Sequence, residues 1–377
     1  MGALAFRRRA GAKMSRDGLW IALFFLLLCA GCSQPPGGAD GYKIAFVPTT
    51  SGQYGIFSMN SDTTGSKMLV ADKMAQVRFA SWSPDGKRLA FYSVRSQDQQ
   101  ILKKYRMINE YLLYVMDATG ENQKRLLDFP VIDFGWAPDS RRLFFISAYE
   151  SPDRDSPEVL AGTRSPLASV YIFDTQTGAM NRLPGAGQNC SASWSPDGNR
   201  LAVGFGIGEN CGIHLISPDG RQSERLTDCA TIDFRPAWSP DGRAIAYVAH
   251  AKTDADARDS GVFVIAADGT GKRRVDDRIT SYVLWSPDGG MLLLQSASTA
   301  RLIEPSGRKQ VLLSAVAGLR SIDNAIFTPD GKRVVFCSND SGAWKIYSIG
   351  LADQKRKTIT IRTSSSNFCL SPLLTRR

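Results

Sequence analysis

The sequence predicts an all-β fold, a β-propeller built from four-stranded blades. The first observation is the pentapeptide Trp-Ser-Pro-Asp-Gly, which recurs with variations at Trp82, Trp136, Trp194, Trp238, Trp285 and Phe327. The second is the spacing of the copies, about 40 to 60 residues, the range in which propeller blades repeat. The third is a short apolar run after every copy, as expected for a strand that neighbouring sheets cover on both faces. The repetition favours one repeat domain over the two or three that this length would allow.

Each repeat contains the elements of one blade in order. The Ser-Pro-Asp-Gly of the motif supplies Pro for a type I turn, Asp for hydrogen bonds to the local backbone and Gly for a positive φ, so the motif forms a hairpin turn. An apolar strand such as Leu89–Tyr92 follows it. Another strand then ends in a second turn, as in Tyr114–Gly120, and a basic strand such as Lys124–Leu127 closes the unit.

Several residue types recur at fixed places in the repeats. We interpret the motif aspartates as turn formers, the tryptophans as blade-packing residues, and the arginines at strand starts as exposed or paired side chains. The aspartates are Asp85, Asp139, Asp197, Asp241, Asp288 and Asp330, and the arginines are Arg88, Arg142, Arg200 and Arg333.

The two ends of the repeat region predict how the ring closes. Three strands without a leading one are expected at about Lys43–Pro48, Tyr54–Met59 and Lys67–Val70, and the segment Asn367–Pro372 resembles a lone leading strand. Joining the two makes a seventh blade and hides strand edges that would otherwise invite aggregation. We therefore expect seven blades, with six as the alternative.

The repeat resembles a known family. Trp82-Ser-Pro-Asp-Gly-Lys-Arg-Leu-Ala-Phe91 precedes a strand that ends in Asp117-Ala-Thr-Gly120, and other repeats continue as Arg225-Leu-Thr227. This pattern is similar to the TolB-type β-propeller repeat and extends over residues 42 to 377. The resemblance implies the fold, whereas propellers of this type serve as scaffolds, as appendages of peptidases and, rarely, as lyases. Because repeat-like strands follow the leader directly, the α/β domain that precedes the propeller in TolB is not expected.

The first 31 residues have the features of a lipoprotein signal peptide. Arg7, Arg8 and Arg9 precede an apolar stretch from Leu19 to Leu28, which is too short to span a bilayer. The sequence Leu28-Cys-Ala-Gly-Cys32 resembles the bacterial lipobox, so we expect lipidation of Cys32. Secretory cleavage after Ala30 is the alternative, and translation could begin at Met1 or at Met14.

Residues 32–42 then form a lipidated cysteine and a flexible linker, and residues 43–377 form the propeller domain. The several acyl chains of a bacterial lipoprotein anchor it stably to a membrane. Ser33 after the lipid site, by resemblance to sorted lipoproteins, favours the outer membrane. We expect a monomeric propeller that faces the periplasm.

The charge and the histidine content exclude several function classes. The formal net charge is +10, of which the leader contributes +4, and no dense basic stripe with interleaved aromatic residues indicates nucleic-acid binding. The chain has two histidines, so a three-histidine metal site is excluded. His214 lies within a predicted strand, and His250 lies at the end of one and is expected to be exposed. Propeller lyases of this type use a histidine cluster, and propeller peptidases carry a Gly-x-Ser-x-Gly elbow. Neither is present, and we expect no metal or cofactor.

Export makes disulfides possible. Cys211 begins a predicted strand and Cys229 ends its partner across the turn at Ser217–Arg221. Opposed strand residues have Cα atoms about 4.5 to 5.5 Å apart, within disulfide reach. We therefore predict a Cys211–Cys229 bridge, with Cys190 as a competing partner.

Three repeats carry an expanded link between their second and third strands, at Arg95–Glu110, Ala148–Ser169 and His250–Ser260. In an up-and-down sheet these links emerge on one face of the disc, and insertions gathered on one face usually mark a binding surface. Plain tolerance of surface insertions is the alternative. The predicted binding-loop residues are Lys103, Lys104, Tyr105, Arg106, Tyr149, Glu150, Arg154 and His250.

Two functions of different classes follow. The first is a non-catalytic, membrane-anchored propeller that binds an envelope protein or a cell-wall or surface polymer through the inserted loops. The second is a carbohydrate-active or peptide-processing enzyme that uses carboxylates in the central channel. Paired, buried acids in the channel would favour the second.

Overall fold

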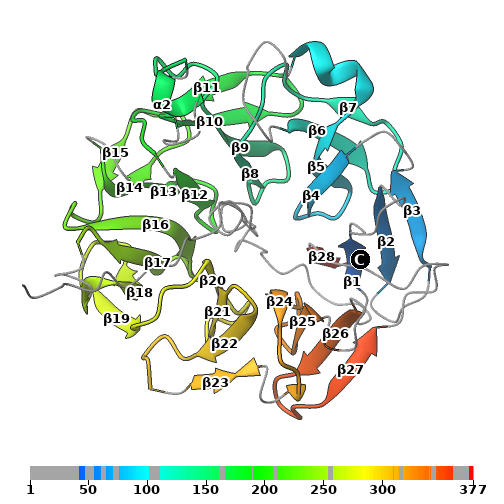
Figure 1. The fold of residues 1–377 in the computed structure, drawn as a ribbon, viewed down its shortest axis with the longest axis vertical. Helices are drawn as coiled ribbons and strands as arrows, with labels where there is room; N and C mark the ends of the chain where they lie inside the picture. Colours follow the sequence, from blue (N-terminus) through cyan, green and yellow to red (C-terminus); the bar gives the residue numbers. More distant parts are fainter. Residues whose placement is uncertain are drawn as a thin grey trace, which may run out of the picture.

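The computed structural model describes residues 42–46, 55–60, 65–70, 76–101, 111–153, 155–160, 166–188, 190–206, 210–253, 258–308, 310–313, 317–338, 340, 345–359 and 373–376. These residues form seven four-stranded antiparallel sheets arranged as the blades of a ring (Figure 1). The predicted all-β propeller with seven blades is confirmed. None of the helices in these ranges is long and apolar enough to cross a membrane.

The strands of each blade are given from the centre of the ring outward. Blade 1 contains β28 (Leu373–Arg376), β1 (Tyr42–Phe46), β2 (Ile56–Asn60) and β3 (Lys67–Val70). Blade 2 contains β4 (Gln76–Trp82), β5 (Arg88–Val94), β6 (Leu112–Asp117) and β7 (Lys124–Arg125). Blade 3 contains β8 (Asp133–Trp136), β9 (Arg142–Ser147), β10 (Ser169–Asp174) and β11 (Met180–Arg182). Blade 4 contains β12 (Ser191–Trp194), β13 (Leu201–Phe205), β14 (Gly212–Ile216) and β15 (Ser223–Arg225).

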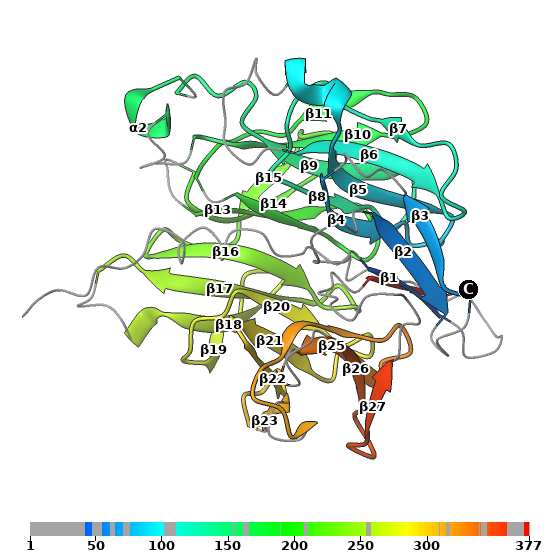
Figure 2. The same cartoon turned by 45° about the vertical axis from the view of Figure 1, so that its right-hand side comes forward.

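The remaining three blades follow the same order. Blade 5 contains β16 (Thr231–Trp238), β17 (Ala244–Ala251), β18 (Gly261–Ala266) and β19 (Arg273–Asp276). Blade 6 contains β20 (Tyr282–Trp285), β21 (Leu292–Ser296), β22 (Thr299–Ile303) and β23 (Gln310–Leu312). Blade 7 contains β24 (Asp323–Phe327), β25 (Arg333–Ser338), β26 (Lys345–Gly350) and β27 (Arg356–Ile359). Two short helices, η2 (Ser96–Asp98) and α2 (Pro157–Leu160), follow β5 and β9, and α2 lies outside the stack of strands (Figure 2).

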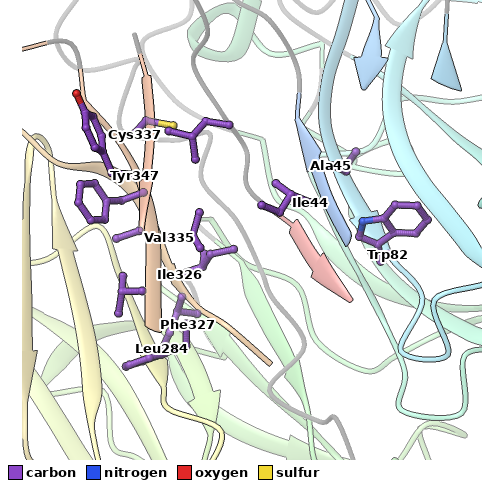
Figure 3. Packing of buried hydrophobic residues seen from close by; sticks show 14 of the residues in the cluster. Ile44, Ala45, Trp82, Leu284, Ile326, Phe327, Val335, Cys337 and Tyr347 are labelled. Carbon is purple, nitrogen blue, oxygen red and sulfur yellow. The ribbon is translucent and has the colours of Figure 1, made fainter. Parts of the chain in front are cut away.

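The ring closes through the C-terminus, as predicted. β28 pairs antiparallel with β1, with Lys43 opposite Thr375 and Ile44 opposite Leu374. The closing strand is Leu373–Arg376, slightly C-terminal to the expected segment Asn367–Pro372, which lies outside the described residues. A single apolar cluster crosses the closure and joins Leu284 of blade 6, Val335 of blade 7, Ile44 of blade 1 and Trp82 of blade 2 (Figure 3).

The repeated motif forms the predicted hairpin turn. In blade 2 the Ser83 hydroxyl donates to Asp85 Oδ1 at 2.6 Å, and the Lys87 N–H donates to the same oxygen at 3.1 Å. Gly86 adopts a φ of 68°, which L side chains rarely adopt. Equivalent Ser or Thr hydroxyl bonds to Asp197, Asp241, Asp288 and Asp330 confirm the interpretation of these aspartates as turn formers.

The motif also connects neighbouring blades, a role for the arginines that the sequence did not predict. Three of the four strand-start guanidinium groups stack on the tryptophan of the next blade, at 5.1 Å for Arg88 over Trp136, 5.0 Å for Arg142 over Trp194 and 5.2 Å for Arg200 over Trp238. The fourth, Arg333, donates to Ser348 Oγ of its own blade at 3.1 Å. Three indoles in turn donate to a backbone carbonyl of the preceding blade: Trp136 to Ser81, Trp194 to Gly135 and Trp285 to Ala237. The motif therefore holds blade to blade as well as strand to strand.

Candidate functional site

The three inserted links lie on one face of the disc, which we call the loop face. Every blade is an antiparallel meander, so the link between its second and third strands emerges at the same end as the connection to the next blade. The links after β5 and β9 are the longest, whereas the link after β17 (residues 252–260) is as long as the link after β1 (residues 47–55). The motif turns lie on the opposite face, which we call the turn face.

A buried carboxylate anchors the start of the first insertion. Asp98 in η2 is fully buried and accepts the Arg95 N–H at 2.8 Å, the Tyr114 hydroxyl at 2.9 Å and Arg125 Nη1 at 3.0 Å. The Arg95 guanidinium lies 4.3 Å from the centroid of the Tyr114 ring. These contacts join the loop to the third and fourth strands of blade 2 and fix where the insertion leaves the ring.

The second insertion begins with an aromatic cluster that carries an acidic group. Tyr149 stacks on Phe129, from the connection between blades 2 and 3, with ring centroids 3.8 Å apart, and also contacts Tyr171. Glu150 accepts the Tyr149 hydroxyl at 2.7 Å and the Tyr171 hydroxyl at 2.8 Å. The Tyr149 hydroxyl is the largest influence on Glu150 and helps to lower the pKa of this carboxyl group. The cluster therefore presents a half-buried ring and an exposed, ionised carboxylate on the loop face.

The third insertion is shorter than predicted. His250 lies within β17 opposite Ile232, because the long inner strand β16 continues the pairing as far as Ala251. The imidazole is half-buried against Phe234, with ring centroids 5.2 Å apart, and burial lowers its pKa. The expectation that His250 is exposed was therefore wrong. His214 is buried in β14 as expected, with Nε2 3.0 Å from the Asn210 carbonyl oxygen.

Exposed apolar side chains add to the loop face. Ile132 lies in the connection between blades 2 and 3, and Ile279 lies in the connection between blades 5 and 6. Leu312 ends the outer strand of blade 6 at the same face. These are three of the five exposed large hydrophobic side chains among the described residues.

Charged groups on the inner strands of different blades influence one another across the centre of the ring. Asp133 begins β8 in blade 3, and burial raises the pKa of its carboxyl group to about 6, although the Arg235 guanidinium of blade 5 opposes the shift. Blade 4 separates the two in the ring, so they can interact only across the channel. Burial raises the pKa of Tyr282 in blade 6, and the Arg235 guanidinium opposes this shift as well. Side chains from the inner strands of blades 3, 5 and 6 thus influence one another electrostatically.

Arg235 lies in a β-bulge of the inner strand of blade 5. The register of β16 shifts between Phe234 and Ala237, and Arg235 adopts a φ of 55°, which is uncommon for a residue other than glycine. Its N–H donates to Ser191 Oγ of blade 4 at 2.8 Å, which holds the strained backbone in place. Such strain is stored where surrounding structure fixes a side chain for a task.

Two acids at the starts of inner strands have raised pKa values because they are buried. Asp323 begins β24 in blade 7, and burial alone raises the pKa of its carboxyl group to about 6. Neither Asp323 nor Asp133 raises the pKa of the other, whereas two carboxylates that share a site do so. No group of three or more His, Cys, Asp or Glu side chains suited to a metal ion occurs within those ranges.

The structure contains the predicted Cys211–Cys229 disulfide, with Cα atoms 5.4 Å apart. The competing candidate, Cys190, is a free thiol that donates to the carbonyl oxygens of Gly187 and Ala168 at 3.0 and 3.2 Å. Burial raises the pKa of the Cys190 thiol to about 12, so it stays protonated.

Of the predicted binding-loop residues, the structure brings Tyr149 and Glu150 together. Lys103, Lys104, Tyr105, Arg106 and Arg154 lie outside the described residues, as does Cys32. The sequence missed Phe129, Asp133 and Arg235, since each acquires its role from a partner on another blade.

Comparison with known proteins identifies the repeat. A model of the TolB beta propeller domain matches residues 102–315, more than half of the chain. The chain is also 24% identical over 219 residues to the uncharacterized peptidase YuxL of Bacillus subtilis, an alignment that covers 55% of the chain and 29% of that protein. The chain spans about half or less of the length of the curated relatives it matches.

Solved structures agree in fold. TolB of Acinetobacter baumannii superposes with a TM-score of 0.52 at 14% identity, over 91% of this chain and 68% of that one. An oligogalacturonate lyase of Vibrio parahaemolyticus superposes with a TM-score of 0.59 at 16% identity, over 81% and 85% of the two chains. At such identities the likeness shows the propeller fold alone.

Proposed function

The chain belongs to the TolB β-propeller domain family, and from this premise we propose that it is a non-catalytic propeller of the bacterial cell envelope, anchored to the outer membrane by lipid on Cys32. In this proposal the loop face binds an envelope protein or a cell-wall or surface polymer.

The proposal rests on the loop face, where insertions and exposed apolar side chains occur together. The described ends of the three insertions and the exposed side chains of Ile132, Ile279 and Leu312 all occur there. Insertions gathered on one face are typical of binding surfaces. The turn face consists instead of short hairpin turns with internal hydrogen bonds.

The loop face supplies the first test. Replacing Lys103, Lys104, Tyr105 and Arg154 with Ala should weaken partner capture while changing the free energy of unfolding by no more than about 0.5 kcal/mol, as is usual for exposed loop residues. The basic side chains should also make association weaken as salt increases. Crosslinking in intact cells, followed by identification of the captured species, measures the effect.

A matched control changes the opposite face. Lys87, Arg221 and Lys332 are basic side chains in turn-face loops, and the Arg221 side chain is 87% exposed. Their replacement with Ala should leave capture unchanged. Full capture by the loop-face variant would contradict the proposal. So would turnover of an envelope polymer by purified protein, if that activity disappears in Asp133→Asn or Asp323→Asn.

The anchor is tested separately. Cys32→Ser should release the protein from membranes into the soluble periplasmic fraction, because lipidation requires the thiol. Its thermal unfolding should match that of the unmodified propeller, since a Pro- and Gly-rich segment separates the cysteine from the ring. Fractionation with immunodetection measures the release. A variant that stays in the membrane fraction would show that Cys32 is not the anchor.

A further inference from the structure

Asp233 is a fully buried acid at the junction of blades 4 and 5. It lies near the start of β16, the inner strand of blade 5, with Ala249 of β17 opposite it. The Thr231 hydroxyl donates to its Oδ1 at 2.6 Å, whereas its Oδ2 makes no hydrogen bond. No salt bridge in the described part of the chain reaches this carboxyl group. An ionised carboxylate could accept about four hydrogen bonds, so the site satisfies an anion poorly.

The side chains packed around Asp233 offer no group that neutralises it at contact distance. Ile213 and Leu215 belong to the apolar cluster that blade 4 packs against this face of blade 5. Tyr247 lies on the same face of β17 as Ala249, but its buried hydroxyl makes no hydrogen bond either. The acid is therefore enclosed mainly by apolar groups.

Burial is the largest influence on Asp233 and raises the pKa of its carboxyl group. The Thr227 and Thr231 hydroxyl groups favour the ionised form instead. Two charged groups act from a longer range and oppose each other: Lys272, which follows β18, lowers the pKa, and Asp228, in the connection between blades 4 and 5, raises it. A buried carboxylate without a counter-ion in contact is costly, and protonation removes this cost.

The Cys211–Cys229 disulfide holds the segment beside this acid. Thr227 precedes Cys229 by two residues, and its hydroxyl accepts the N–H of Ile213, two residues after Cys211, at 2.9 Å. The bridge thus keeps the connection between the blades against blade 4. This restraint limits the opening that would hydrate Asp233.

We propose that Asp233 is a neutral carboxylic acid in the folded protein, and that its ionisation, as the pH rises, weakens the junction between blades 4 and 5. The junction is then a pH-sensitive element of the ring, and it does not depend on partner binding at the loop face. In the unfolded chain the carboxyl group is hydrated and ionises near its ordinary pKa of 3.8. Between that value and the raised pKa of the folded state, unfolding releases a proton. The stability that this acid contributes therefore falls as the pH rises through that window.

Denaturant titration of the full-length protein and of Asp233→Asn, at several pH values between about 4 and 8, tests the proposal. Asparagine resembles the neutral acid in shape and does not ionise. The ratio of the two unfolding constants cancels the contributions of Asp133 and Asp323, whose pKa values are also raised. We expect the unfolding constant of the starting protein to rise relative to that of the variant, by up to about tenfold for each pH unit within the window. A ratio that stays constant with pH would overturn the proposal.

The matched control is Asp241→Asn, in the motif turn of the same blade. The Ser239 hydroxyl donates to the Asp241 carboxylate at 2.6 Å and is the largest influence that lowers its pKa. Its window lies below 3.8, so the corresponding ratio should not change across the scan. An equal pH dependence in Asp241→Asn and Asp233→Asn would contradict a specific role for the buried acid.

Two further measurements keep the test decisive. Asp228→Asn alters an exposed side chain and removes a negative charge near Asp233, so the rise in the unfolding constant should begin at lower pH. This variant tests the proposal even if Asp233→Asn does not fold, and an unmoved rise would count against it. Addition of Ca²⁺ at neutral pH should not stabilise the starting protein more than Asp233→Asn. A selective stabilisation would place a metal ion where we place the proton and would overturn the proposal.

Discussion

Deleting residues 373–377 should destabilise the entire ring rather than trim a tail. The deletion removes β28 and with it the pairing to four residues of β1. The inner edge of blade 1 is then open. At about 1 kcal/mol for each net backbone hydrogen bond, the loss is about 4 kcal/mol, a large part of the usual 5 to 15 kcal/mol. We expect the melting temperature to fall by roughly 10 °C. The exposed strand edge should also promote aggregation.

Two controls isolate the closure. Removing Arg377 alone keeps β28 and should leave the melting temperature unchanged. Adding a peptide of residues 366–377 to the shortened protein should restore stability in proportion to peptide concentration, because a ligand of the native state stabilises it by mass action. A shortened protein that melts at the original temperature would contradict ring closure by this strand.

Replacing both Cys211 and Cys229 with Ser should lower the free energy of unfolding by about 3 kcal/mol. The bridge closes a loop between residues 18 apart, and chain-entropy models give about this value for such a loop. Denaturant titration measures the loss. The dependence of the free energy on denaturant concentration should be reported beside the midpoint, because an unfolded chain without the bridge is less compact. The control is Cys190→Ser, which removes a free thiol and keeps the bridge.

Peptide mapping without reduction provides an independent measurement. A linked pair of peptides containing Cys211 and Cys229 is expected. Free thiols at both positions, or equal stability of the double variant and the starting protein, would rule out a stabilising role for the bridge.

The blades were predictable because their information is local. The Ser-Pro-Asp-Gly turn forms hydrogen bonds among its own residues. The apolar run that follows it predicts a strand in every repeat. The closing strand was placed a few residues too early. Leu373–Arg376 has no such run, and its position is fixed by pairing with β1, at the other end of the chain.

The candidate site was less predictable because ring geometry creates it. The topology of the insertions gave the loop face, but the stacking of Tyr149 on Phe129 joins segments of two blades, and no local pattern signals it. Asp133 and Arg235 lie two blades apart and interact only across the channel. The position of His250 depended on the length of its partner strand, β16.

The closure also dictates when this protein can finish folding during its synthesis. The inner strand of the first blade, β28, follows every other described strand along the chain, so blades 2 to 7 can assemble in order while blade 1 waits. A chain that ends prematurely cannot complete its first blade. Ring closure therefore waits for β28, since only a chain that has reached this strand can cover the exposed edge of β1.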